Sequence, residues 1–187
     1  MARILAFAVV LLMLSSTAMG VAQEKSVKSN SSKPTLFYPD DENRGFDNAD
    51  PPSDAVLDAL LATPEVKDTV EEMSDSKMDV DRVALRKLFE VVPVDLGGTS
   101  KNSYMVLGRF PMSGGDCNWF WIVRADPRMA VVLYSAGLSL ELRRTKTNGY
   151  RDIRETWGTA ATHGYRFYRY DGFRYKAGRD HVQTVKP

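Results

Sequence analysis

Cysteine and histidine are scarce in this chain of 187 residues. There is one cysteine, Cys117, and there are two histidines, His163 and His181. A single cysteine excludes an intramolecular disulfide, so burial of apolar side chains must hold the core together. These imidazole and thiolate groups are too few and too scattered to form a zinc site. We therefore expect neither a metal nor a cofactor.

Short catalytic motifs are absent as well. The chain contains neither Gly-x-Ser-x-Gly nor His-Glu-x-x-His. The glycine-rich stretch MSGGD, residues 112–116, lacks the lysine of a phosphate-binding loop and is interpreted as a turn. The acidic stretch 40–50 places Arg44 where an EF-hand loop needs an oxygen ligand. Cys117 adjoins an apolar segment, which favours a buried, inert thiol over a nucleophile or an intermolecular disulfide.

The longest apolar run lies at the N-terminus, MARILAFAVVLLMLSSTAMGVAQ. Arg3 precedes an apolar stretch over 4–14, and small residues follow at cleavage spacing, which is typical of a secretory signal peptide. The stretch is too short to span a bilayer. We therefore predict a signal peptide over 1–22, a secreted or periplasmic protein, and no transmembrane segment in the mature chain.

The charge is divided along the chain. Residues 23–99 carry nine Lys and Arg against seventeen Asp and Glu, whereas residues 100–187 carry fifteen against seven. Such a division marks either a nucleic-acid-binding arm or two segments of one domain that attract each other. Export and the acidic half argue against nucleic acid.

Residues 23–52 are polar and lack an apolar period, which predicts a disordered arm. Whether its apolar cluster at 36–38 docks on the domain or on a partner is left open. Helical signals occupy 53–90, with caps expected at Asp54 and Asp79 and a helix start at Pro64. Their apolar stripes face either the core or, alternatively, a groove for a partner. The third stripe consists of Val80, Val83, Ala84 and Leu88.

After residue 90 the apolar period becomes two. The predicted strands are 91–95, 104–110, 117–124, 129–135, 138–144, 150–157, 164–170 and 174–176. Short connections, including Asn148-Gly149 and Asp171-Gly172, predict an antiparallel meander. The fold class is therefore α+β, with N-terminal helices packed on an antiparallel β-meander sheet in one domain over 53–178 (helices 53–90, sheet 91–178), followed by a tail, 179–187. The predicted core comprises Trp119, Trp121, Ile122, Val131, Leu133, Leu140 and Ile153.

The stretch TNGYRDIRETWGTAATHGYRFYRYDGFRY, residues 147–175, is rich in aromatic and basic side chains. Alternation places Tyr165, Phe167 and Arg169 on one face of a strand. Arg166, Tyr168 and Tyr170 lie on the other. Tyr and Arg are efficient contact residues, but cross-strand packing explains them equally well. The candidate binding surface comprises Tyr150, Arg151, Arg154, Arg166, Tyr168, Arg169, Tyr170 and Arg174.

A Gly-Tyr-x-Asp-Ile strand, residues 149–153, precedes a Tyr-x-x-Asp-Gly-x-x-Tyr hairpin, residues 168–175. With FWIVR and LELRR upstream, this pattern resembles poorly characterised exported bacterial proteins over residues 104–176. The resemblance implies a bacterial exported protein and supplies no catalytic residues.

Two kinds of function remain open. The first is an exported, non-catalytic binding or inhibitory protein of the bacterial cell envelope, whose partner is an envelope protein or an anionic or carbohydrate ligand. The alternative is a hydrolase acting on an envelope polymer through carboxylates such as Asp152 and Glu155. Fold alone does not separate them.

Overall fold

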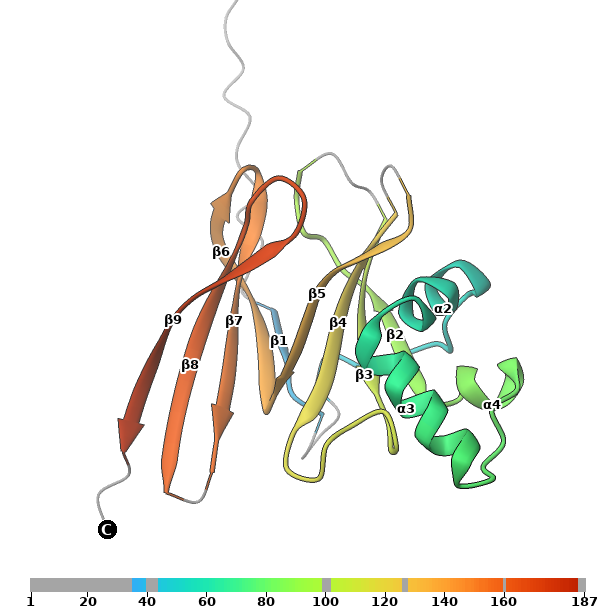
Figure 1. Ribbon diagram of the computed structural model, residues 1–187. Coiled ribbons are helices and arrows are strands. Elements are labelled where there is room, and N and C mark those ends of the chain that lie inside the picture. Colours follow the sequence, from blue (N-terminus) through green and yellow to red (C-terminus); the bar gives the residue numbers. More distant parts are fainter. Residues whose placement is uncertain (1–34, 40–43, 99–101, 126–127, 160, 185–187) are drawn as a thin grey trace, which may run out of the picture. The chain divides into compact units, whose positions relative to one another are not determined.

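Nine strands and three helices make up the part of the chain that the structure describes (Figure 1). The computed structural model describes residues 35–39, 44–98, 102–125, 128–159 and 161–184. The predicted signal peptide lies outside these ranges. In chain order the elements are β1 (Thr35–Phe37), α2 (Asp54–Leu61), α3 (Pro64–Asp75), α4 (Arg82–Arg86), β2 (Phe89–Pro93), β3 (Ser103–Gly108), β4 (Asn118–Arg124), β5 (Ala130–Gly137), β6 (Ser139–Thr147), β7 (Tyr150–Gly158), β8 (Thr162–Tyr170) and β9 (Tyr175–Thr184).

The helices begin close to the predicted positions. The hydroxyl of Ser53, one residue before the predicted cap, accepts a hydrogen bond from the Val56 amide and starts α2. Pro64 occupies the first turn of α3, where its missing N–H costs nothing. Within the described ranges, every helix is too short or too polar to cross a bilayer.

The position of α4 corrects one prediction. The carboxylate of Asp81, not that of Asp79, accepts the first two amide hydrogen bonds of this helix. In this helix Leu85 is buried and Val83 is 65% exposed. The predicted inward stripe was therefore wrong at Val83.

Strands β2 to β5 form a four-stranded antiparallel sheet in the order β2-β3-β4-β5. Strands β6 to β9 continue the meander in a five-stranded antiparallel sheet, which β1 joins beside β6. Only Leu138 separates β5 from β6, and its amide already donates to the Thr156 carbonyl of β7 at 2.8 Å. The chain therefore passes from one sheet to the other at Leu138.

Two apolar cores result. One lies between the sheets and includes Ile122, Leu133, Leu140 and Ile153. The other lies between the four-stranded sheet and the helices, around Trp121. The predicted core is confirmed at these five positions. The remaining two predicted core residues, Trp119 and Val131, are partly buried against the helix-side core.

The predicted α+β class was wrong, because the chain is mostly β and its strands form two packed antiparallel sheets. Residues 119–123 and 130–134 are apolar on both faces of their strands, which is typical of strands covered on both sides. Helices do cover one face, but the second sheet covers the other. A run of short connections predicts neighbouring strands, and it does not reveal where a meander changes sheets.

Part of the predicted arm and part of the predicted tail belong to the fold. Phe37 and Phe46 are at most 2% exposed and pack against each other with ring centroids 5.5 Å apart. Residues 179–184, predicted as tail, continue β9. Both segments are polar apart from these few residues, so sequence periodicity did not identify them.

Candidate ligand-binding face of the five-stranded sheet

The eight residues of the predicted binding surface do not share one face. Four are buried, with exposures of 9% or less: Tyr150, Arg151, Tyr168 and Tyr170. Arg154 and Arg166 are about one-third exposed, and Arg169 and Arg174 are exposed. The expectation that the arginines and tyrosines of this hairpin lie together at the surface is therefore corrected for the four buried residues.

Arg151 is buried because it satisfies carbonyl groups inside the fold. The pairing of β6 with β7 shifts register between Leu142 and Lys146, so the backbone here departs from regular strand pairing. The Arg151 guanidinium donates to the carbonyl oxygens of Leu142 at 2.5 Å and Arg143 at 2.8 Å. Burial lowers the pKa of Arg151 from its ordinary value. Arg151 therefore has a structural role inside the fold.

The buried tyrosines form a cluster with Arg124 of β4. The Arg124 guanidinium lies 5.3 Å from the ring centroid of Tyr150 and 5.1 Å from that of Tyr170, and it also hydrogen-bonds the Tyr170 hydroxyl. Tyr175 donates to the Arg151 carbonyl at 2.9 Å. The tyrosines of the Gly-Tyr-x-Asp-Ile and Tyr-x-x-Asp-Gly-x-x-Tyr patterns thus hold the two sheets together.

Tyr168 points inward to a buried carboxylate. Its hydroxyl donates to Glu155 at 2.6 Å, and Glu155 is 2% exposed. Burial, followed by the hydrogen bond to Glu155, raises the pKa of Tyr168 to about 12. Arg166 lies 3.8 Å from Glu155 and makes a two-bond contact with Asp180 of β9.

The two carboxylates of the alternative function are held separately. The Thr147 hydroxyl donates to Asp152 at 2.7 Å, and Asp152 is 8% exposed. Glu155 is held by Tyr168. No hydrogen bond joins Asp152 to Glu155 in the described part of the chain, and both have partners that explain their positions.

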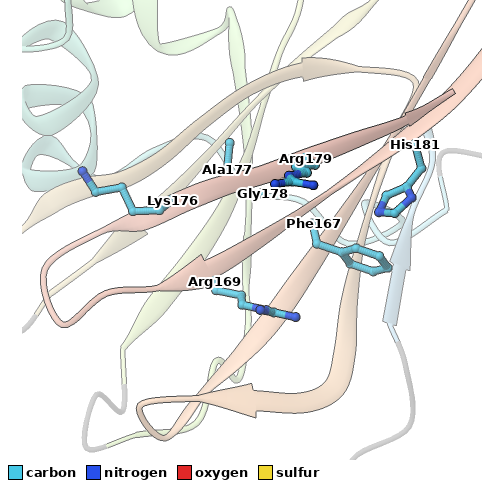
Figure 2. Close-up of a pocket in the computed structure, with 7 residues that line it drawn as sticks. All are labelled: Phe167, Arg169, Lys176, Ala177, Gly178, Arg179 and His181. Carbon is cyan, nitrogen blue, oxygen red and sulfur yellow. The ribbon is translucent and has the colours of Figure 1, made fainter.

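A shallow hollow of about 340 Å³ lies on β8 and β9, and we call it the β8–β9 hollow (Figure 2). It is lined by Phe167, Arg169, Lys176, Ala177, Gly178, Arg179 and His181. The pairing of β8 with β9 shifts register between Arg166 and Tyr168, so β9 carries an extra residue opposite this part of β8. The irregular pairing is what brings Gly178 and Arg179 to the hollow.

The aromatic part of this region is built from three rings. Tyr165 and His181 are cross-strand partners, and their rings stack with centroids 4.6 Å apart. Phe167 meets both rings nearly at right angles, at 5.5 Å and 6.0 Å. The Arg143 guanidinium lies 5.9 Å from the Phe167 ring centroid. An aromatic surface therefore adjoins the cations.

The basic part contains three exposed cations, Arg169, Lys176 and Arg179. Arg169 and Lys176 are direct cross-strand partners, which places two like charges opposite each other. Lys176 has a distant carboxylate partner in Asp171, at 3.8 Å. Neither the Arg169 nor the Arg179 guanidinium has a hydrogen bond or an ion pair with any residue that the structure describes.

Neighbouring arginines differ in this respect. Arg143 and Arg154 both contact the carboxylate of Glu141, at 3.4 Å and 2.6 Å, respectively. Both therefore have a carboxylate partner within the sheet. Arg169 and Arg179 reach the β8–β9 hollow without such a partner among the described residues.

Sequence reasoning identified Arg169 as a candidate and missed the other lining residues. Phe167 was correctly placed on the same face as Arg169, but it was not among the candidate binding residues. Arg179 and His181 were assigned to a tail. They could have been found by recognising β9 as the strand that pairs with β8. The polar sequence of β9 does not indicate a strand.

Comparison with models of known protein families, with curated proteins and with solved structures finds no match for this chain. Among the described residues, His, Cys, Asp and Glu side chains do not gather in groups of three that could hold a metal ion. The β8–β9 hollow is therefore the feature of the structure that bears on function.

Proposed function

We propose that the protein is an exported, non-catalytic binding protein of the bacterial cell envelope, and that its β8–β9 hollow holds an anionic group of its partner. One observation carries the proposal: Arg169, Lys176 and Arg179 surround one hollow with too little negative charge to balance them. An anion placed between them would supply the missing charge-assisted hydrogen bonds.

The cross-strand pair of Arg169 and Lys176 favours this interpretation. Opposite charges across a strand pair contribute roughly 0.2–1 kcal/mol, and like charges directly opposite are destabilising. Residues that weaken a fold without packing into it are typical of functional sites, where activity and stability compete. Ordinary sheet packing explains Arg143 and Arg154, which share Glu141, but it does not explain Arg169.

The acidic residues of α2 do not neutralise this face. In α2, Asp54 pairs with Arg82 and Arg86 of α4, and Asp58 pairs with Arg82. The helices pack on the outer face of the four-stranded sheet, on the side away from the five-stranded sheet. At about 10 Å per layer, roughly 20 Å separates them from the hollow. Salt screens charges beyond a Debye length of about 10 Å.

Retention on immobilised dextran sulfate tests this proposal. The double variant Arg169→Ser/Arg179→Ser removes two cations of the hollow. The matched control, Arg128→Ser/Arg144→Ser, removes two exposed cations that do not line it. We expect the hollow variant to elute at markedly lower salt than the wild type, and the control to elute close to the wild type. Equal elution of the two double variants would contradict the proposal.

Export is part of the same proposal and has its own test. The apolar stretch 4–14 and the small residues after it support cleavage near residue 22. We expect the intact mass of the exported protein to lack residues 1–20 or 1–22. A mass that retains Met1 would contradict export through a cleaved signal peptide.

A further inference from the structure

We infer that the β8–β9 hollow is a subsite for one anionic sugar residue, a pyranose ring that carries a carboxylate or a sulfate. This inference rests on the proposed function and adds the chemical class of the group that the hollow holds. It is carried by the combination of an aromatic ring with unbalanced cations in one small hollow.

The size of the hollow limits the occupant. A volume of about 340 Å³ lies at the lower end of the range for small-molecule sites. At ~30 Å³ of liquid volume per water it has room for roughly ten water molecules, which a group of ten to twenty non-hydrogen atoms would replace. One sugar residue of a longer chain fits this size, with its neighbours lying outside the hollow along the sheet.

Phe167 supplies the contact that a sugar ring needs. Tyr165 and His181 meet it nearly at right angles, and the Arg143 guanidinium lies over one of its faces, 5.9 Å from the ring centroid. A sugar ring would therefore lie on the opposite face of Phe167. The C–H face of a pyranose is apolar, and burial against an aromatic side chain removes both surfaces from water. His181 lies beside Phe167 in the hollow and can exchange hydrogen bonds with sugar hydroxyl groups (Figure 2).

The cations supply the contact that the anionic group needs. Arg169 projects from β8 and Arg179 from β9, so two guanidinium groups reach the hollow from different strands. Guanidinium groups bind the oxygens of a carboxylate or a sulfate through paired hydrogen bonds. An acidic peptide side chain would satisfy these cations equally well, but it would have no apolar ring face to place against Phe167.

Titration calorimetry of the full chain distinguishes these occupants. The probes are a hexamer of galacturonic acid, a sulfated glucose hexamer, a neutral glucose hexamer and hexaglutamate. The variants are Arg169→Ser, Phe167→Leu and Phe167→Trp, with Arg144→Ser as the control for loss of one exposed cation. Circular dichroism of each variant verifies folding, and Phe167→Trp restores a ring where Phe167→Leu removes it.

We expect the wild type to bind at least one acidic hexasaccharide more tightly than the neutral one and hexaglutamate. The preferred hexasaccharide identifies the anionic group as carboxylate or sulfate. Arg169→Ser should weaken that binding about tenfold or more, as expected for loss of a charge-assisted contact. Phe167→Leu should weaken it similarly without changing hexaglutamate binding, Phe167→Trp should restore it, and Arg144→Ser should leave it unchanged.

Three results would overturn the inference. If Phe167→Leu binds the acidic hexasaccharides as the wild type does while Arg169→Ser loses all acidic probes, the hollow selects charge alone; the sugar subsite is then wrong and the proposed function stands. If the wild type binds hexaglutamate but neither acidic hexasaccharide, the sugar subsite is likewise wrong and the proposed function stands. If the wild type binds no acidic probe, or if Arg169→Ser binds every probe as the wild type does, both the inference and the proposed function are wrong.

Discussion

Arg151 and Arg169 are both arginines of the same hairpin, and the structure predicts opposite consequences when each is replaced by alanine. The Arg151 side chain is buried, with Arg151 3% exposed, and donates to two carbonyl oxygens at a register shift in the sheet. Hydrogen bonds to charged groups contribute about 1.5–3 kcal/mol each, and breaking a buried network costs more than a surface change. We therefore expect Arg151→Ala to lower the free energy of unfolding by about 3–5 kcal/mol.

Arg169→Ala should leave stability almost unchanged. Arg169 is exposed, its guanidinium has no partner among the described residues, and it faces Lys176 across the strand pair. Surface substitutions of this kind change stability by about 0.5 kcal/mol or less, and removal of a like-charge contact favours a small gain. Binding to anionic probes should instead be lost in Arg169→Ala.

Urea denaturation followed by tryptophan fluorescence measures the difference. With a slope of about 2 kcal/mol per molar urea for a chain of this size, the Arg151→Ala midpoint should fall by roughly 2 M. Arg151→Lys keeps the charge but loses the fork geometry, so its midpoint should lie between those of the wild type and Arg151→Ala. Equal midpoints for Arg151→Ala and Arg169→Ala would refute the assignment of one arginine to the interior and the other to the hollow.

Two further predictions concern the interior. Tyr168 has an ordinary pKa of 10.0 when unfolded and a pKa raised to about 12 when folded, so its contribution to stability is complete below pH 10 and is lost as pH rises towards about 12. Tyr168→Phe should flatten the fall of the urea midpoint over this pH window, and an unchanged slope would contradict the pKa shift. Trp121 is 0% exposed and its indole N–H donates to Glu65 at 2.8 Å, so Trp121→Ala should cost about 3–5 kcal/mol in urea denaturation. A loss below about 1 kcal/mol would contradict its buried position.

Alternation in the sequence placed the side chains of β8 correctly but did not tell which face is inside. Tyr165, Phe167 and Arg169 do share one face, and Tyr168 and Tyr170 share the buried one. Each face carries aromatic rings and arginine, so hydrophobicity does not separate them. Which face of β8 turns inward depends on residues of other strands. Arg124 lies over the Tyr170 ring, and Glu155 accepts a hydrogen bond from Tyr168.

The β8–β9 hollow could be predicted only in part for a related reason. The stretch AGRDHVQT, residues 177–184, has no apolar alternation because β9 is an edge strand and exposed along this length. Its pairing with β8 brings Arg179 and His181 to the hollow. The residues that face each other across β8 and β9 depend on the hairpin geometry and on the bulge. A single sequence specifies neither.

We propose that the outer face of β8 and β9 binds the anionic ligand. Backbone amide NMR shifts of the labelled protein, followed during titration with the anionic probe that binds most tightly, test it most directly. We expect the largest chemical-shift changes at Phe167, at Arg169 and over residues 176–181. The shifts of residues in α2 and α3 should remain unchanged. Largest changes in α2, in α3 or in the four-stranded sheet would contradict it.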